Sequence, residues 1–130
     1  MSEVTLFACC LCRFSPEEKS RDDLSGGEHL LARVQAELKA RNLQERIAVR
    51  PLRCMAACSR GCNVTLAAPG KLTFVLSGLS PTESAVALSE FCEQYVATPE
   101  GKVPYRERSA IVREATALIL PPLPYSPPQQ

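Results

Sequence analysis

Six of the seven cysteines of this chain fall in two short clusters whose spacing suits the binding of a metal ion or an iron-sulfur centre. The clustered residues are, in chain order, Cys9, Cys10, Cys12, Cys54, Cys58 and Cys62. Thiolates are ligands of zinc and of iron-sulfur centres, and cysteine groups on two loops can meet at one such centre in a compact fold. The two clusters are therefore the strongest candidates for a functional site.

The net charge and the apparent lack of targeting segments indicate the compartment of the protein, and the compartment decides whether these thiols are reduced. The 130 residues carry a net charge of +1, from 15 basic and 14 acidic side chains, which gives no general attraction to nucleic acid or to anionic membranes. The chain opens without a signal-peptide pattern and has no apolar stretch of the ~20 residues that a membrane helix needs. We therefore expect a cytoplasmic protein with no nucleic-acid and no membrane partner. In that compartment clustered cysteines are more often ligands or redox groups than disulfides.

The elements around the first cluster follow from hydrophobic patterning and capping residues. Residues 4–8 are β-prone and lead into the cluster, so its first cysteine lies at the carboxyl end of a strand. The polar residues 15–27 predict a loop. Ser25 and Glu28 have the spacing of a capping box, and apolar residues then recur at helical spacing to about Arg41.

The second cluster lies between further strands. Residues 47–52 predict a strand that leads into the cluster, and Pro51, which cannot donate to a ladder, suggests a sheet edge or a strand end. Residues 63–67 and 71–76 flank a Pro69-Gly70 turn, which predicts an antiparallel hairpin.

The remaining residues predict two more helices. Ser80 and Pro81 have the types typical of an N-cap and a first helical position, and the helix should end near Thr98. One face of this helix carries apolar residues, among them Cys92, which we therefore expect to be a buried core residue rather than a ligand. A short helix is predicted over residues 110–118.

The order strand, helix, strand, cysteine loop, hairpin, helix contains one right-handed parallel crossover followed by an antiparallel pair. It matches an α/β, thioredoxin-like fold, in which a small mixed sheet of about four strands is flanked by helices. We expect one domain over residues 1–120 and a proline-rich, disordered tail over residues 121–130. In this fold the loop after the first strand and the loop before the third lie side by side, which would bring the two cysteine clusters together.

Several motifs resemble the bacterial domain of unknown function 1636, a family described as predicted metal-binding. The resemblance extends from residue 4 to about residue 124. Its motifs are, in chain order, Cys9-x2-Cys12-Arg13, Cys54-x3-Cys58-Ser59-Arg60-Gly61-Cys62, Pro69-Gly70-Lys71 and Gly101-Lys102-Val103-Pro104-Tyr105-Arg106-Glu107-Arg108. The resemblance implies a metal-binding protein.

A more distant similarity is to thioredoxin-like 2Fe-2S ferredoxins and to the corresponding small subunit of respiratory NADH dehydrogenases. Those proteins use two cysteines after the first strand and a Cys-x3-Cys segment before the third. This resemblance places the four ligands of a 2Fe-2S cluster on Cys9, Cys12, Cys54 and Cys58. Cys62 stays open as a fifth candidate metal ligand, and Cys10 as a spare.

The charges around the second cluster favour a negatively charged centre. Residues 53–62 contain no acidic residue, and Arg13, Arg53 and Arg60 flank the candidate ligands. A four-thiolate iron-sulfur centre is an anion whose charge grows on reduction, so nearby positive groups raise its reduction potential. The same arginines would attract an acidic partner.

The cysteines also allow other interpretations. Zinc accepts four thiolates, and the spacing of Cys9 and Cys12 is usual in zinc knuckles, which fits a carrier or sensor of zinc, iron or cobalt. A cysteine pair after the first strand also fits a thioredoxin-like thiol-disulfide oxidoreductase, although Gly61-Cys62 stands where such enzymes have a cis-proline. A helix over residues 54–62 would instead line up the second cluster as an apolar stripe.

We therefore expect a 2Fe-2S ferredoxin-like carrier of one electron, without catalytic residues of its own, that serves an unidentified redox partner protein. The resemblance also implies a possible homodimer. We expect His29, which is the single histidine of the chain, to be solvated rather than a ligand.

Overall fold

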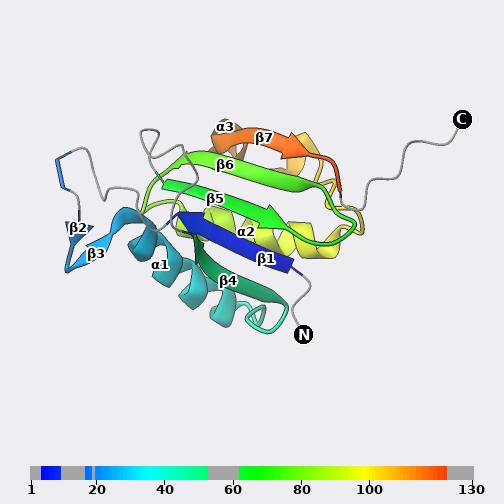
Figure 1. Ribbon diagram of the computed structural model, residues 1–130. Coiled ribbons are helices and arrows are strands. Elements are labelled where there is room, and N and C mark those ends of the chain that lie inside the picture. The colour runs from blue at the N-terminus through cyan, green and yellow to red at the C-terminus, as the bar shows by residue number, and fades with distance from the viewer. Residues whose placement is uncertain (1–3, 10–16, 19, 53–61, 123–130) are drawn as a thin grey trace, which may run out of the picture.

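The computed structural model of the chain describes residues 4–9, 17–18, 20–52 and 62–122. Figure 1 shows a single small domain built around a mixed sheet with the strand order β4-β1-β5-β6-β7. Its strands are β1 (Val4–Cys9), β4 (Ile47–Leu52), β5 (Cys62–Ala67), β6 (Thr73–Leu79) and β7 (Thr116–Leu120). The helices are α1 (Gly26–Ala40), α2 (Ala85–Ala97) and α3 (Ala110–Ala115), with a 3-10 helix at Tyr105–Glu107. The short strands β2 (Ser20–Arg21) and β3 (Leu24–Ser25) pair with each other.

The strand pairing confirms the predicted thioredoxin-like fold. Strand β1 is parallel to β4, and α1 forms the crossover between them. Strand β5 is antiparallel to both β1 and β6, so β5 and β6 form the predicted hairpin. Pro51 lies in β4, which is an edge strand, as its missing backbone donor suggested.

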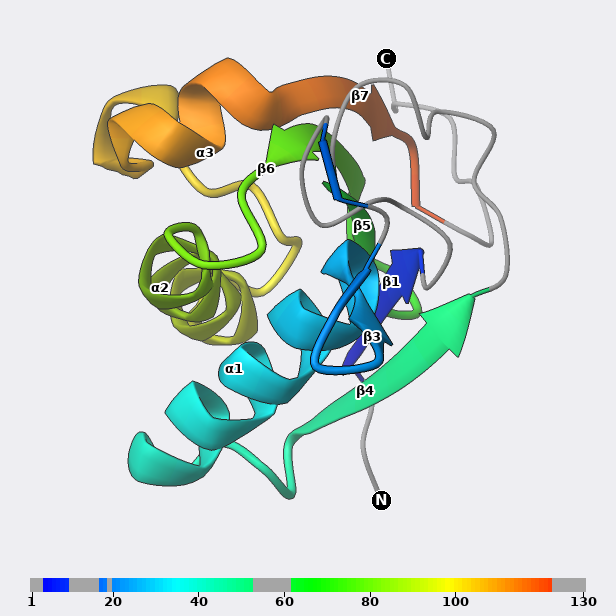
Figure 2. The same ribbon diagram turned by 90° about the vertical axis from the view of Figure 1, so that its left-hand side faces the viewer.

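Helices α1 and α2 lie against the same face of the sheet (Figure 2), and the hydrophobic core lies between them and the strands. The alternating residues Val4, Leu6 and Ala8 of β1 point into this core, as do Phe74 and Leu76 of β6. The intervening residues point to the opposite face, which we call the far face. It carries, among others, Phe7, Cys9, Arg50, Asn63, Thr65, Val75 and Ser77.

The predicted capping box of α1 is confirmed. The Ser25 hydroxyl accepts the backbone N–H of Glu28 at 3.2 Å, and the Glu28 carboxylate accepts the Ser25 N–H at 2.9 Å. His29 is only partly exposed, and its Nε2 lies 2.6 Å from the carbonyl oxygen of Arg21. This side chain therefore keeps some contact with solvent and also links α1 to β2.

The loop predicted over residues 15–27 is not irregular throughout. Strands β2 and β3 form a small hairpin whose two turn residues, Asp22 and Asp23, have φ angles of 54° and 64°. A two-residue hairpin turn with positive φ at both positions fits the twist of its strands, and aspartate tolerates that conformation better than most residues. The polar composition concealed this hairpin.

Helix α2 begins four residues later than the predicted first position. The Ser80 hydroxyl accepts the N–H groups of Thr82 and Glu83 at 3.3 and 3.1 Å, but residues 81–83 form a turn and the helix starts at Ala85. The capping residues thus form their local hydrogen bonds without extending the helix to Pro81.

None of the described helices is long and apolar enough to cross a membrane.

The helix predicted over residues 110–118 was wrong in its last three residues. Helix α3 ends at Ala115, and residues 116–120 form β7, which pairs with β6 and gives the sheet a fifth strand. Residues 116–120 contain no glycine or proline that would interrupt a helix. Their strand conformation is therefore decided by the pairing with β6.

Gly101 is a position where a side chain should be strongly destabilising. Its φ is +70°, and an added Cβ would lie 2.8 Å from Cε2 of the buried Tyr95 ring, which is itself held by a hydrogen bond from its hydroxyl to the Leu72 carbonyl. We expect Gly101→Ala to lower the free energy of unfolding by about 2–4 kcal/mol, from left-handed backbone strain and overpacking together. Chemical denaturation measures the loss.

Gly70→Ala is the matched control for this prediction. Gly70 has a nearly equal φ of +74°, but its added Cβ would meet no atom within 4 Å. Only the backbone term remains, so we expect a loss of about 1 kcal/mol. Equal losses in the two variants would show that the contact with Tyr95 is unimportant.

Candidate metal centre

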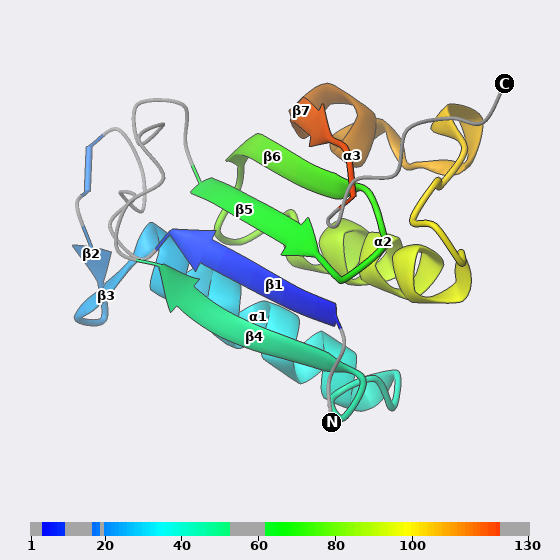
Figure 3. The ribbon, with the colours of Figure 1, turned by 45° about the vertical axis from the view of Figure 1, so that its right-hand side comes forward.

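The strand ends that flank the two cysteine clusters meet at one end of the sheet. Cys9 ends β1 and pairs with Leu52 at the end of β4, while Val64, near the start of β5, pairs with Ala8. Figure 3 shows the arrowheads of β1 and β4 beside the beginning of β5. The attachment points of the two loops therefore agree with the adjacency expected from the fold.

Most of the predicted ligands fall outside the described residues. These are Cys12, Cys54 and Cys58, together with the spare Cys10 and the flanking Arg13, Arg53 and Arg60. The ligand set therefore stays a prediction. Within the part of the chain that the structure describes, no three side chains of metal-binding type gather at one point.

Of the four predicted cluster ligands, Cys9 lies within the described residues. Its side chain has no exposed surface, and it lies on the far face, because the core positions of β1 are the alternating residues Val4, Leu6 and Ala8. A cysteine buried outside the apolar core, at the end of a strand, is well placed to meet ligands from adjoining loops.

Cys62 has a different orientation. It is 1% exposed, belongs to the hydrophobic core and pairs across the hairpin with Leu79, which is also a core residue. Cys9 and Cys62 therefore point to opposite faces of the sheet. This geometry favours a packing role for Cys62 over its candidacy as a fifth metal ligand.

Sequence analysis did not identify a polar pair on the far face near the start of β5. Asn63 is 1% exposed on the far face of β5, and the Ser77 hydroxyl of β6 donates to its Oδ1 at 2.7 Å. Burying a carboxamide is costly unless its polar atoms are hydrogen-bonded. An asparagine in an otherwise apolar strand next to a cysteine cluster was the signal that could have revealed it.

A positive charge lies on the same face. Arg50 is exposed on β4 and pairs with Phe7, two residues before the pairing of Leu52 with Cys9. Its backbone is therefore displaced by about 7 Å along the strands from the level of Cys9. Arg50 adds to the basic setting that the neighbouring arginines predicted for the centre.

Cys92 is a core residue, as predicted. It is 0% exposed within α2, and burial raises the pKa of its thiol to about 12, with the nearby Arg41 acting in the opposite direction. A thiol whose pKa is raised in this way is a poor nucleophile and a poor metal ligand, because both roles need the thiolate. Cys92 is thus separated from the candidate centre in both position and chemistry.

The raised pKa of Cys92 predicts a loss of stability in alkaline solution. Below about pH 8.5 the thiol is protonated in both the folded and the unfolded chain. Between that value and about 12, the unfolded chain loses the proton while the folded chain keeps it, so the free energy of unfolding falls as the pH rises. This contribution should approach ~1.4 kcal/mol for each pH unit.

Cys92→Ala provides the test of this pH dependence, because it removes the thiol and leaves every other titrating group in place. We expect the stability difference between the wild type and the variant to shrink as the pH is raised from 8 to 10.5 in urea titrations. A difference that stays constant over this range would contradict the assignment.

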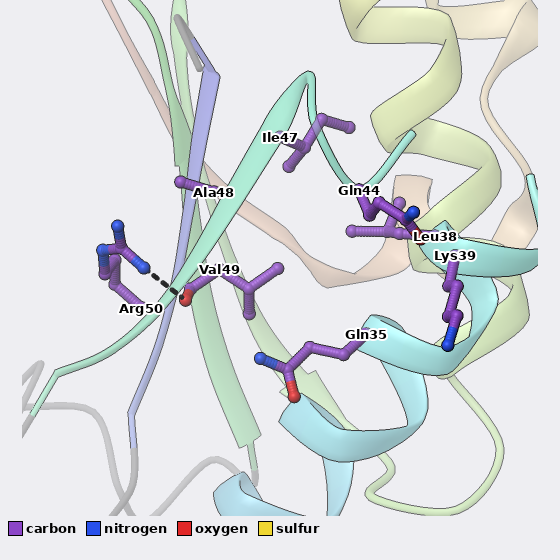
Figure 4. A pocket seen from close by; sticks show the side chains of 8 residues that line it. All are labelled: Gln35, Leu38, Lys39, Gln44, Ile47, Ala48, Val49 and Arg50. Carbon is purple, nitrogen blue, oxygen red and sulfur yellow. Dashed lines mark hydrogen bonds between the residues drawn. The ribbon is translucent and has the colours of Figure 1, made fainter. Parts of the chain in front are cut away.

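The cavity between α1 and β4 contains no cysteine. It has a volume of about 380 Å3, and Figure 4 shows its lining residues, which are Gln35, Leu38, Lys39, Gln44, Ile47, Ala48, Val49 and Arg50. The side chains of Gln35, Gln44 and Lys39 lie beside aliphatic residues, whereas Arg50 points away from them (Figure 4), and these groups are not a typical donor set for a metal ion. The candidate centre therefore lies at the cysteine end of the sheet and not in this cavity.

The fold resembles that of known proteins. Two solved structures of a thioredoxin-like [2Fe-2S] ferredoxin from Aquifex aeolicus are similar to the chain, each at 18% sequence identity. One superposes with a TM-score of 0.58 over 96% of this chain and 100% of the ferredoxin, and the other, the wild-type protein, with 0.56 over 89% and 97%. This likeness shows the thioredoxin-like fold.

No curated protein matches the chain by sequence. The model of the family described as "Protein of unknown function (DUF1636)" matches residues 6–122, a range that includes both cysteine clusters and every strand of the main sheet except the first two residues of β1. The chain is therefore a member of the DUF1636 family.

Proposed function

We propose that this protein is a small 2Fe-2S ferredoxin-like carrier of one electron, with the cluster held by Cys9, Cys12, Cys54 and Cys58. The observation that carries the proposal is the position of Cys9. This thiol is buried at the end of the sheet from which both cysteine-bearing loops leave. The same fold occurs in the Aquifex aeolicus ferredoxin, whose name states a [2Fe-2S] cluster.

The chemistry of the donor set fits this centre. Four cysteine thiolates are the usual ligands of a 2Fe-2S cluster, which supplies one-electron redox chemistry when it is bound. Burial of Cys9 at the end of β1 would position one ligand and keep water from its sulfur. The exposed Arg50 on the same face, with the arginines of the two loops, would offset the negative charge of the thiolates.

In this proposal the protein has no catalytic residue and acts through a redox partner in the cytoplasm. The partner would approach the end of the sheet that carries Cys9, since electron transfer requires closeness to the centre. Arg50 and the loop arginines give this end positive charge, which suits an acidic docking surface.

Anaerobic purification tests the proposal directly. The absorption spectrum is recorded before and after dithionite, and iron, sulfide and zinc are measured for the same sample. We expect visible bands that bleach on reduction, with about two irons and two sulfides for each chain. A colourless protein with one zinc would instead support a zinc carrier or sensor, and a metal-free dithiol with disulfide reductase activity would support the oxidoreductase.

A further inference from the structure

We propose that Asn63 donates a hydrogen bond from its side-chain amide to the sulfur of Cys9, that Ser77 sets the direction of this amide, and that the bond raises the reduction potential of the centre. This inference rests on the proposed function, because it assigns a role to Asn63 at the same site.

Strand register places Asn63 beside Cys9. Val64 pairs with Ala8 in the antiparallel β1–β5 ladder, so the residue before Val64 lies next to the residue after Ala8. Both side chains occupy the far face, since Ala8 and Val64 are core residues on their strands. Side chains at such neighbouring positions have Cβ atoms about 4.5–5.5 Å apart, which is within reach of a carboxamide.

The hydrogen bond with Ser77 orients the amide. Strand β5 lies between β1 and β6 in the sheet, and Ser77 belongs to β6. Because the Ser77 hydroxyl donates to Oδ1 of Asn63 at 2.7 Å, the carboxamide oxygen faces β6. The amide nitrogen is on the other side of the planar group and therefore faces β1, where Cys9 lies.

The burial of Asn63 makes the hydrogen bonds of its carboxamide energetically important. Asn63 is 1% exposed, and burying a carboxamide is costly unless its polar atoms are hydrogen-bonded, as its oxygen is to Ser77. The sulfur of a ligating cysteine is an acceptor whose negative charge grows on reduction. A donor directed at it therefore stabilises the reduced state more than the oxidised state and raises the potential.

Asn63→Leu and Ser77→Ala test the inference, with Thr65→Val as the matched control. Thr65 is also a far-face residue of β5, two positions further along the strand, and valine has nearly its shape. We expect Asn63→Leu to reduce the ratio of reduced to oxidised protein at a fixed ambient potential about tenfold, which is about 60 mV for one electron. Ser77→Ala should lower the ratio about threefold, and Thr65→Val should leave it unchanged.

Redox titration monitored by electron paramagnetic resonance measures the midpoint, and iron is quantified on the same samples. A wild-type protein without an iron-sulfur cluster would overturn the proposed function and this inference together. A loaded wild type whose potential is the same in Asn63→Leu and Thr65→Val would overturn the inference alone. If Asn63→Leu fails to fold or to hold iron, Ser77→Ala decides, because an unchanged potential in that variant contradicts the orienting role and a lowered one supports it.

Discussion

Cys9→Ser should abolish stable cluster assembly. Replacing a thiolate ligand with a hydroxyl removes one of four bonds to the centre, and the hydroxyl stays protonated at neutral pH. We expect the affinity for the metal centre to fall by more than the 10–100-fold that follows the loss of an outer hydrogen-bonding partner. Iron and sulfide analysis after anaerobic purification measures the loss, together with the visible absorption.

Cys92→Ser is the control for this variant, because both cysteines are fully buried and the chemical change is the same. Cys92 lies within α2 among core residues, so its replacement should lower stability while the iron content for each folded chain is preserved. Equal iron contents in the two variants would remove Cys9 from the ligand set. If iron is instead lost in Cys10→Ser alone, the role passes to Cys10.

Phe74→Ala should cause the largest loss of stability. Phe74 is 0% exposed, and its ring contacts the Phe91 and Tyr95 rings edge to face, with centroids 5.0 and 6.1 Å away. The Arg108 guanidinium lies 5.2 Å from the same ring. Truncation leaves a cavity between β6 and α2 and should cost about 3–5 kcal/mol, a large part of the 5–15 kcal/mol that is typical of a whole domain.

Val75→Ala, at the adjacent position of β6, separates core packing from strand effects. Val75 lies on the far face and is partly exposed, so we expect a loss of about 1 kcal/mol. Urea denaturation of both variants measures the difference. Similar losses for Phe74→Ala and Val75→Ala would show that the aromatic contacts contribute little.

The parts of the fold that were predictable from sequence are those governed by local chemistry. The capping box of Ser25 and Glu28 fixed the start of α1, and the Pro69-Gly70 turn marked the β5–β6 hairpin. Pro51 indicated an edge strand because it lacks a backbone donor. These signals depend on a few neighbouring residues and do not require knowledge of the packing.

The parts that were missed depend on contacts between distant residues. Residues 116–120 carry no pattern that separates a strand from a helix, and only the pairing with β6 makes them β7. Asn63 is hydrogen-bonded by Ser77, which lies 14 positions away on another strand. Likewise, the spacing of the cysteines does not show which face of the sheet each side chain occupies. The opposite orientations of Cys9 and Cys62 therefore became clear only from the strand pairing and the core packing.

The convergence of both cysteine-bearing loops at one end of the sheet also has a consequence for folding. Between the two cysteine clusters, the chain forms the short β2–β3 hairpin, helix α1 and strand β4, which pairs in parallel with β1. Such a non-local parallel crossover is slow and entropically costly to close. A centre bonded to both loops would be a cross-link across that unit, and it would restrict the unfolded chain much as a disulfide does. Loading with metal would thereby become part of the folding equilibrium, and the protein would owe some of its stability to its cofactor.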